Sequence, residues 1–381
     1  MMKKNWIRAI GAGLVVAIWL GLTGYLWFGP KNPFSDAERR PLAQAPELTT
    51  DSLLDGKFMT AFEEYTLDQF PMRDTMRQLK SIFHYYVLRQ LDNNDIYVED
   101  GYAAKLEHKI DTHAVERLVG FLDKVYNLSL KGKAENVYLS IVPDKSFYLA
   151  EANGYLSMDY DRFFAMVKEK TPWASYIDIT GSLDIHDYYY TDTHWRQEKL
   201  FDAAQALCQG MGVSAPDRGD YTKVALERPF YGVYYGQAAL PMKPEPLYIL
   251  KNDILDGCTT SKAVLDFQTG QVSYEPLYQS VYDRNKENAK DLYEVYLSGS
   301  ESILRIENPN AKTDKELVVF RDSFGSSMVP LLVNDYRTVT LIDIRYISHS
   351  VLNRFVDFTG KDVLFLYSTS VLNNPGTQFM P

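Results

Sequence analysis

Two short stretches of the sequence contain the residue types that together activate a serine nucleophile. The motif TDTHW places Asp192 and His194 two residues apart. The motif RDSFG places Ser323 just after an apolar run, where a strand is expected to end. A serine hydroxyl is a weak nucleophile until a base accepts its proton, and a histidine base works best when a carboxylate fixes its tautomer. The pattern predicts serine-dependent acyl chemistry, as in a hydrolase or an acyltransferase.

A structural interpretation of the same residues competes with the catalytic one. Asp and Ser often act as N-caps of helices, so the DSFG segment is also typical of a capped helix that follows a strand. In the same way Thr191 or Asp192 would cap a helix after TDTHW, with Trp195 packed in the core. The catalytic interpretation therefore requires both motifs to lie at one edge of the same sheet.

The elements that must position these motifs alternate along the chain beyond Asn93. Apolar runs predict strands, and apolar residues at helical spacing predict helices between them. This β-α-β order predicts an α/β fold with a parallel sheet flanked by helices and right-handed crossovers. The predicted strands are 137–142, 176–179, 317–320, 338–342 and 363–367, and the predicted helices are 115–125, 162–169, 197–211, 326–333 and 350–358.

Polar side chains follow most of the predicted strands. Ligands of open parallel sheets bind beyond the carboxyl ends of the strands, so these side chains are expected to meet at one edge. A helix that begins at Ser323 would offer its free amides to a developing oxyanion, with Gly299 or Gly325 as a second donor. The residues expected at this edge are Asp144, Lys145, Ser146, Asp192, His194, Ser323, Asp343, Arg345, Tyr367 and Ser368.

The region 213–300 interrupts the alternation and predicts an irregular insertion near the site. It is rich in Pro, Gly and Tyr, as in YGVYYG at 231–236, and no sustained helix is expected in it. Thr269 and Gly270 are a candidate hairpin turn.

The N-terminus has the composition of a membrane anchor. A charge-free, apolar stretch from Ala9 to Pro30 is about as long as a helix that crosses a bilayer. Basic residues before it and an acidic chain after it predict a single-pass protein of the cell membrane, with its bulk outside the cytoplasm. A cleaved signal peptide is the alternative, but no small-x-small site follows the apolar run. The predicted domains are the anchor at 1–30, a linker and helical stem at 31–92, and a catalytic domain at 93–381.

Composition excludes some functions. With 40 Lys and Arg against 50 Asp and Glu, the net charge of −10 argues against a nucleic-acid partner. Only Cys208 and Cys258 are present, so at most one intrachain disulfide is possible. The spacing of His186 and Asp187 with His194 lacks a metal-binding helix pattern, and no phosphate-binding loop is present. We therefore expect neither a metal nor a cofactor.

Together the two motifs resemble the DHHW family, which is similar to alginate O-acetyltransferases of the AlgX and AlgJ type, with an SGNH-hydrolase-like catalytic domain. TDTHW matches the family's Asp-x-His-Trp signature and RDSFG its Asp-Ser motif. Weaker similarity extends over most of the chain beyond the anchor, in ERRPLAQAP at 38–46, DQFPMRD at 68–74, VPDK at 142–145 and YGVYYG at 231–236.

The resemblance implies roles for particular residues. Ser323 would be the nucleophile, His194 the general base and Asp192 its orienting carboxylate. Arg321 stands where ordinary SGNH enzymes have the glycine of Gly-Asp-Ser, so the resemblance does not assign the residues of the oxyanion hole. The candidates for oxyanion or substrate contacts are Arg321, Gly299, Gly325, Lys145, Arg345 and Tyr367, although the three charged side chains fit salt bridges equally well.

The resemblance also implies a substrate and a partner. An extracytoplasmic O-acyltransferase of this kind would acetylate a cell-surface or secreted polysaccharide, with its acyl donor supplied by a membrane-bound O-acyltransferase (MBOAT). Two alternatives stay open at this point: a carbohydrate esterase of the SGNH type, and a non-catalytic polysaccharide-binding or scaffold protein.

Overall fold

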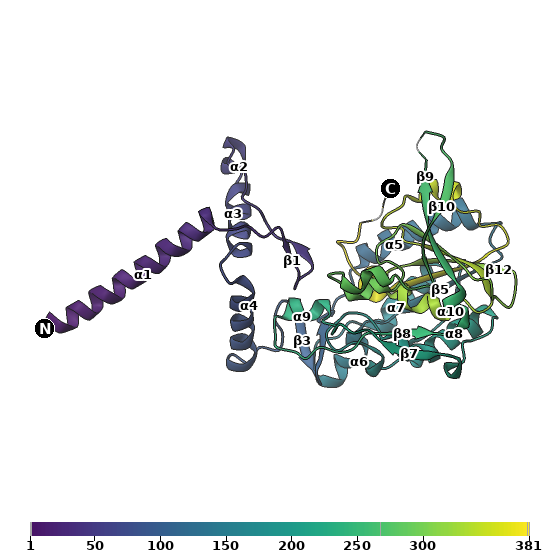
Figure 1. The fold of residues 1–381 in the computed structure, drawn as a ribbon, viewed down its shortest axis with the longest axis horizontal. Coiled ribbons are helices and arrows are strands. Elements are labelled where there is room, and N and C mark those ends of the chain that lie inside the picture. The colour runs from purple at the N-terminus through teal and green to yellow at the C-terminus, as the bar shows by residue number, and fades with distance from the viewer. Residues whose placement is uncertain (1, 267, 379, 381) are drawn as a thin grey trace. The chain divides into compact units, whose positions relative to one another are not determined.

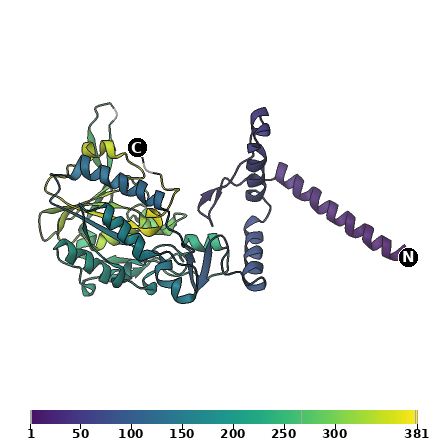
Figure 2. The same cartoon turned by 180° about the vertical axis from the view of Figure 1, so that it is seen from behind.

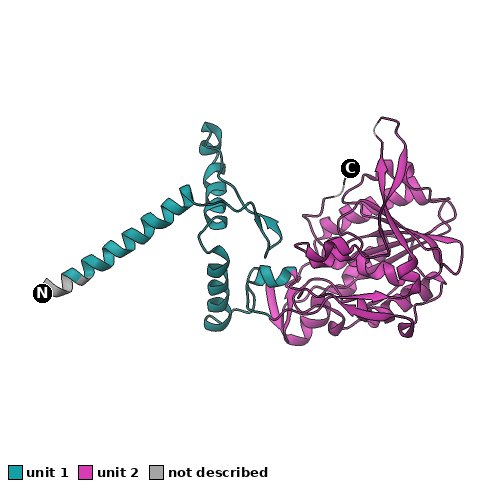
Figure 3. Ribbon diagram, in the orientation of Figure 1, with its two compact units in different colours: residues 1–94, 233–242 teal, residues 95–232, 243–381 magenta. Residues whose placement is uncertain are grey.

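The computed structural model of the chain describes residues 2–266, 268–378 and 380. Met1, the first residue of the predicted anchor, lies outside the described residues. The chain forms two compact units, which are coloured separately in Figure 3. The smaller unit contains residues 1–94 and 233–242, and the larger contains 95–232 and 243–381.

The larger unit is built on an eight-stranded sheet with the order β10-β9-β11-β13-β12-β14-β5-β6 (Figure 1). The strands from β13 to β6 are parallel, whereas β11, β9 and β10 extend the sheet in antiparallel fashion. The α/β prediction is confirmed. The strands are β5 (Asn136–Val142), β6 (Ser175–Tyr176), β9 (Thr259–Leu265), β10 (Val272–Gln279), β11 (Ile303–Glu307), β12 (Lys315–Arg321), β13 (Tyr336–Ile342) and β14 (Asp362–Ser368).

Both faces of this sheet are buried, as its central strands show. Along β12, Leu317 and Val319 join one hydrophobic core, and Val318 and Phe320 join the other. Successive side chains of a strand point to opposite faces, so a continuous apolar run fits a strand that is covered on both sides. Helices α8 (Phe201–Met211) and α11 (Ser323–Met328) contribute to the first core, and α5 (Thr112–Val125), α7 (Tyr160–Lys170) and α12 (Leu352–Phe355) contribute to the second; Figure 2 shows the reverse side.

Several predicted elements have other bounds in the structure. The strand predicted at 176–179 is only Ser175–Tyr176, because β6 is an edge strand and the chain then enters short 3-10 turns. The helix predicted at 350–358 is mostly absent: a 3-10 turn precedes α12, and Val356 is already extended, with φ −134°. The helix predicted at 326–333 begins at Ser323, as expected for the helix that offers its amides to the oxyanion, and it continues beyond Met328 as a 3-10 turn.

The region 213–300 is more regular than a loop. Its second half forms the β9–β10 hairpin, whose turn contains Gly270 with φ +70° and whose tip extends beyond the sheet in Figure 1. Its first half contains the two-stranded sheet of β7 (Thr222–Ala225) and β8 (Tyr248–Lys251) and the short helix α10 (Asp253–Gly257). A second small hairpin, β3 (Ile96–Glu99) with β4 (Tyr102–Lys105), was not predicted. Cys208 and Cys258 are both buried and both free.

The smaller unit begins with the apolar helix α1 (Met2–Phe28). Within it, Arg8–Phe28 is long and apolar enough to cross a membrane, with a mean hydropathy of 1.9. The hydroxyl of Tyr65 donates to the Leu26 carbonyl at the end of this helix (2.7 Å). The other elements of the unit are β1 (Phe34–Ser35), β2 (Arg40–Pro41), α2 (Thr50–Leu54), α3 (Lys57–Asp68), α4 (Arg73–Ile82), a π-helical turn (Phe83–Val87) and α9 (Val233–Ala238).

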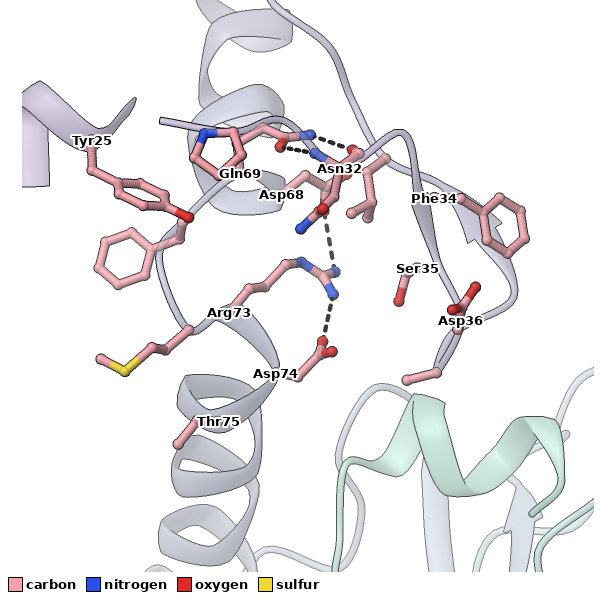
Figure 4. Close-up of a pocket in the computed structure, with 15 residues that line it drawn as sticks. Tyr25, Asn32, Phe34, Ser35, Asp36, Asp68, Gln69, Arg73, Asp74 and Thr75 are labelled. Carbon is pink, nitrogen blue, oxygen red and sulfur yellow. Dashed lines mark hydrogen bonds and ion pairs between the residues drawn. The ribbon is translucent and has the colours of Figure 1, made fainter. Parts of the chain in front are cut away.

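A network of ion pairs joins two motifs of this unit, ERRPLAQAP and DQFPMRD, which have weaker similarity to the resembled family. Asp68 accepts two bonds from Arg40, of 2.7 and 2.8 Å, and one from the Ala43 amide. Arg73 pairs with Asp68 and Glu38, and Figure 4 shows its guanidinium between Asp68 and Asp74. We refer to Glu38, Arg40, Asp68, Arg73 and Arg77 as the stem network.

Candidate active site

The two chemical motifs meet in one hydrogen-bonded chain. Asp192 Oδ1 lies 2.5 Å from His194 Nδ1, and His194 Nε2 lies 2.7 Å from Ser323 Oγ. Asp192 is fully buried, His194 is 6% exposed, and Ser323 is half-buried. With Nδ1 donating to the carboxylate, Nε2 is left to accept the proton of the serine hydroxyl. The structure thus brings the three predicted residues into the order that nucleophile activation requires.

Ser323 stands at the carboxyl end of the central strand β12, which ends at Arg321. Asp322 is the N-cap of α11: its Oδ1 accepts the Phe324 amide (3.0 Å), while its Oδ2 accepts the Ser368 amide (2.7 Å) at the end of β14. The capping interpretation is therefore correct for Asp322 and leaves Ser323 free to face His194. Ser323 is the first helical residue, where a backbone amide has no acceptor within the helix.

Lys145 is a buried residue at the start of α6 (Lys145–Leu149), and it stabilises the chain segment that leads into the Asp192–His194 loop. Its ammonium donates to the carbonyls of Ala103 (2.5 Å), Tyr189 (2.7 Å) and Tyr190 (3.3 Å). Burial lowers the pKa of Lys145 to about 7, although the charge of Asp192 opposes this shift. Lys145 therefore fixes the segment that enters the TDTHW motif.

Glu245 and Gly232 hold the other side of this loop. Glu245 is buried, and its Oε1 accepts the Thr191 amide (3.1 Å). Burial raises the pKa of Glu245, while that hydrogen bond lowers it. The Gly232 amide donates to the Thr191 hydroxyl (2.9 Å), and a Cβ at Gly232 would lie 2.2 Å from the Cα and Cβ of Asp192. Only glycine fits at this close approach.

Trp195 ties the base to the helix that carries the nucleophile. Its indole nitrogen donates to the Phe324 carbonyl (3.1 Å) and to the Ser327 hydroxyl (2.9 Å). The indole is fully buried, and its ring meets that of Phe324 edge to face at 5.4 Å. Because Phe324 and Ser327 lie on α11, the Asp-x-His-Trp motif and Ser323 are fixed to each other through this contact.

Tyr293 is the site residue that sequence reasoning missed. Its ring stacks on the His194 imidazole with centroids 3.9 Å apart and planes 9° apart. Its hydroxyl lies 2.7 Å from Ser327 Oγ. Tyr293 lies in the region predicted to be an irregular insertion, and nothing in its local sequence separates it from the other tyrosines there.

The remaining candidates lie near the strand ends, and most have partners of their own. Arg321 is buried and donates to the Gly299 carbonyl (3.0 Å). The Gly325 amide donates to the Asp322 carbonyl (3.1 Å), and a Cβ at Gly325 would lie 2.7 Å from the Arg321 Cβ. Burial lowers the pKa of Arg321, and Asp343 opposes this shift.

Arg345 forms a bidentate ion pair with Asp343, with bonds of 2.8 and 2.6 Å. Tyr367 is fully buried, and its hydroxyl has no hydrogen-bond partner in the described part of the chain. The placement of Arg345 matches the salt-bridge interpretation. A substrate or oxyanion role for these candidates stays a prediction.

The fold and this arrangement define a class: the chain is an α/β protein with a mostly parallel sheet and an Asp-His-Ser hydrogen-bonded chain at the carboxyl ends of its strands. The resemblance to the DHHW family is confirmed, since residues 175–342 match the family described as DHHW protein. This match spans TDTHW, RDSFG and the stacked Tyr293. A comparison with curated proteins gave no match.

Solved structures show the same fold. A DHHW family protein from Eubacterium siraeum is 21% identical with a TM-score of 0.58, covering 75% of this chain and 94% of that one. Bacillus cereus PatB1, solved with a sulfonyl adduct, is 19% identical with a TM-score of 0.55, covering 77% and 99%. The O-acetyltransferase domain of Pseudomonas putida AlgJ is 14% identical with a TM-score of 0.42, covering 75% of this chain and 95% of that one.

Proposed function

We propose that the protein is a membrane-anchored extracytoplasmic O-acyltransferase that acetylates a cell-surface or secreted polysaccharide through an acyl-serine intermediate. The observation that carries the proposal is the hydrogen-bonded chain from Asp192 through His194 to Ser323. The match to the DHHW family and the fold shared with PatB1 support it.

The first half-reaction forms the acyl-serine. His194 Nε2 accepts the Ser323 hydroxyl proton while Oγ attacks the carbonyl carbon of the acyl donor. Asp192 stabilises the resulting imidazolium. The tetrahedral intermediate collapses when the bond to the leaving group breaks, and that group takes the proton from His194. We expect the Ser323 amide, at the start of α11, to be one donor to the oxyanion.

The second half-reaction releases the acyl group. His194 accepts a proton from an acceptor hydroxyl, whose oxygen attacks the acyl-serine carbonyl. The Ser323 oxygen then leaves and regains the proton from His194. A sugar hydroxyl in this step gives transfer, and water gives hydrolysis, so the chemistry of the acceptor decides between acyltransferase and esterase.

The N-terminal helix supports a location at the membrane. A span of about 20 apolar residues crosses a bilayer, and Arg8–Phe28 meets this requirement. Anchored there, the site would receive its acyl group from a membrane-bound O-acyltransferase (MBOAT) partner.

The proposal is tested by following one acetyl group. The full chain in detergent micelles is incubated with p-nitrophenyl acetate, with and without acetyl-free oligosaccharides, and the peptide containing Ser323 and both products are analysed by mass spectrometry. We expect an acetyl group on Ser323 that moves to the sugar. Release to water alone, at an unchanged rate with every sugar, would identify an esterase. A Ser323 peptide that is never acetylated would refute serine catalysis.

A further inference from the structure

The imidazole of His194 is enclosed by aromatic side chains as well as by its two hydrogen-bond partners. Tyr293 covers one face in parallel at 3.9 Å, and Phe324 approaches at 4.9 Å with a tilt of 56°. Asp192 and Ser323 occupy the two ring nitrogens. These contacts favour one orientation of the ring, in line between the carboxylate and the serine.

Tyr293 is itself held firmly. It is 4% exposed and lies in a 3-10 turn (Leu292–Val295), whose N-cap Asp291 accepts the Tyr293 amide (2.9 Å). Its hydroxyl lies within hydrogen-bond distance of Ser327, which also accepts from Trp195. One serine on α11 therefore fixes both the residue after His194 and the ring stacked on His194.

The Tyr293 hydroxyl is not suited to carry a proton during the reaction. Burial raises the pKa of this phenol well above its usual range, and neighbouring carboxylates, Asp192 and Asp322 among them, act in the same direction. The hydroxyl lies 2.7 Å from Ser327 Oγ, which is not a member of the Asp192–His194–Ser323 chain. What Tyr293 presents to His194 is the face of a neutral ring.

The face of an aromatic ring attracts a cation, most strongly where water is excluded. His194 is neutral before Ser323 loses its proton and positively charged afterwards. An interaction that is stronger in the charged state lowers the barrier, whereas one that is equal in both states does not.

We propose that Tyr293 is a positioning residue for His194, which holds the imidazole in line between Asp192 and Ser323 and stabilises the imidazolium formed when Ser323 attacks. This inference rests on the proposed function. It assigns to the 292–295 turn a role in the reaction that neither motif reveals.

The test compares Tyr293→Phe, which keeps the ring face, with Tyr293→Leu and Tyr293→Met, which remove it. The rate at which a sulfonyl fluoride labels Ser323 is measured from pH 5 to pH 9 on the full chain in detergent. The matched control is Tyr126→Leu, which removes a similar stack, on Trp173 at 4.7 Å and 8°, away from the site.

We expect Tyr293→Phe to stay within about twofold of the unmodified protein at the high-pH plateau. With Leu or Met the plateau should fall by roughly five- to thirtyfold, the size of a desolvated cation–π interaction. The midpoint should also move to lower pH by roughly half a unit to one and a half units, because the protonated imidazole loses its stabilisation. The Tyr126→Leu control should change neither quantity.

Other charged groups near His194 do not differ between these variants. Asp192 lies on the loop of His194 itself, Asp322 caps α11, and Lys145 interacts electrostatically with Asp192. A difference in midpoint between Phe and Leu therefore reports the ring face. Equal plateaus and midpoints for Phe, Leu and Met would overturn the inference, and so would a Phe variant that falls as far as Leu. Unlabelled Ser323 in the unmodified protein would instead refute the proposed function.

Discussion

The candidate active site and the stem network both contain charged side chains that are buried or partly buried, but they are built in opposite ways. In the stem network each charge has more than one partner: Asp68 receives Arg40, Arg73 and the Ala43 amide, and Glu38 receives Arg73 and Arg77. In the active site the polar groups form a linear chain of hydrogen bonds, from Asp192 through His194 to Ser323, which ends at a half-buried hydroxyl.

The difference indicates that the stem network serves stability, whereas the active-site chain serves reactivity. A network whose donors and acceptors are all satisfied favours one conformation and leaves no group free to react. In a linear chain of hydrogen bonds the carboxylate supports the histidine, and the histidine accepts the proton of the terminal hydroxyl. That hydroxyl is therefore the group that becomes reactive. Substitutions in the two regions should therefore have different consequences.

The largest loss of activity should follow substitutions in the Asp192–His194–Ser323 chain itself. Ser323→Ala, His194→Ala and Asp192→Asn should each lower the rate of p-nitrophenyl acetate turnover by about 10⁴-fold or more, while the proteins stay folded. The matched control is Ser326→Ala on the same helix, because the Ser326 hydroxyl has no hydrogen-bond partner among the described residues. A His194→Ala protein that keeps most of its rate would show that the Asp192–His194–Ser323 chain is not functional.

Gly232→Ala should displace the Asp192–His194–Ser323 hydrogen-bonded chain without replacing any of its residues. The new methyl group would overlap the backbone of Asp192, at 2.2 Å, so the loop must move. A displacement of about 1 Å costs roughly 100-fold in rate, and the overpacking should cost about 1–3 kcal/mol in the free energy of unfolding. Gly181→Ala, which meets nothing within 4 Å, is the control, and equal rates in both variants would contradict the account.

Lys145→Met should change how stability depends on pH. Burial lowers the pKa of Lys145 to about 7, so the folded protein binds fewer protons than the unfolded chain between about pH 7 and 10.4. Folding stability should therefore gain from this group as the pH rises through that window. Thermal unfolding of both proteins across the window should show this gain only with Lys145 present. The same slope in Lys145→Met, or its loss in the exposed Lys124→Met, would contradict the assignment.

Asp68→Asn should have the smallest effect on the reaction rate, but it should measurably lower the stability of the stem. Burial acts to raise the pKa of Asp68, but its bonds from Arg40 and Ala43 prevail and hold it at about 2. The network should therefore add stability above about pH 4 and lose it as the pH falls towards 2.

Limited proteolysis of residues 31–92 at neutral pH measures this contribution. Asp68→Asn should weaken protection by about 2–3 kcal/mol and leave ester turnover within about twofold. Asp55→Asn, in an exposed pair with Lys57, should leave this protection almost unchanged. Similar proteolysis of the Asp55 and Asp68 variants would show that the network does not hold the stem.

The parallel core was predictable from the sequence because its strands are continuous apolar runs. Predicted strands such as 137–142 and 317–320 differ from β5 and β12 by at most two residues at either end. Short elements were less predictable. The edge strand β6 and the helix α12 are set by tertiary pairing and by backbone turns, not by periodicity.

The site could be predicted only where residue types were diagnostic. Asp192, His194 and Ser323 carry their chemistry in the side chain and follow predicted strands. Tyr293 and Gly232 act through packing against partners that are distant in the sequence. Contacts of this kind leave no local pattern.

The central claim is that His194 activates Ser323, and covalent labelling tests it most directly. The full chain is treated with a sulfonyl fluoride, and the peptide containing Ser323 is analysed by mass spectrometry alongside His194→Ala and Ser326→Ala. The account predicts an adduct on Ser323 in the unmodified protein and in Ser326→Ala, and none in His194→Ala. An adduct that forms equally fast without His194, or no adduct at Ser323 at all, would contradict it.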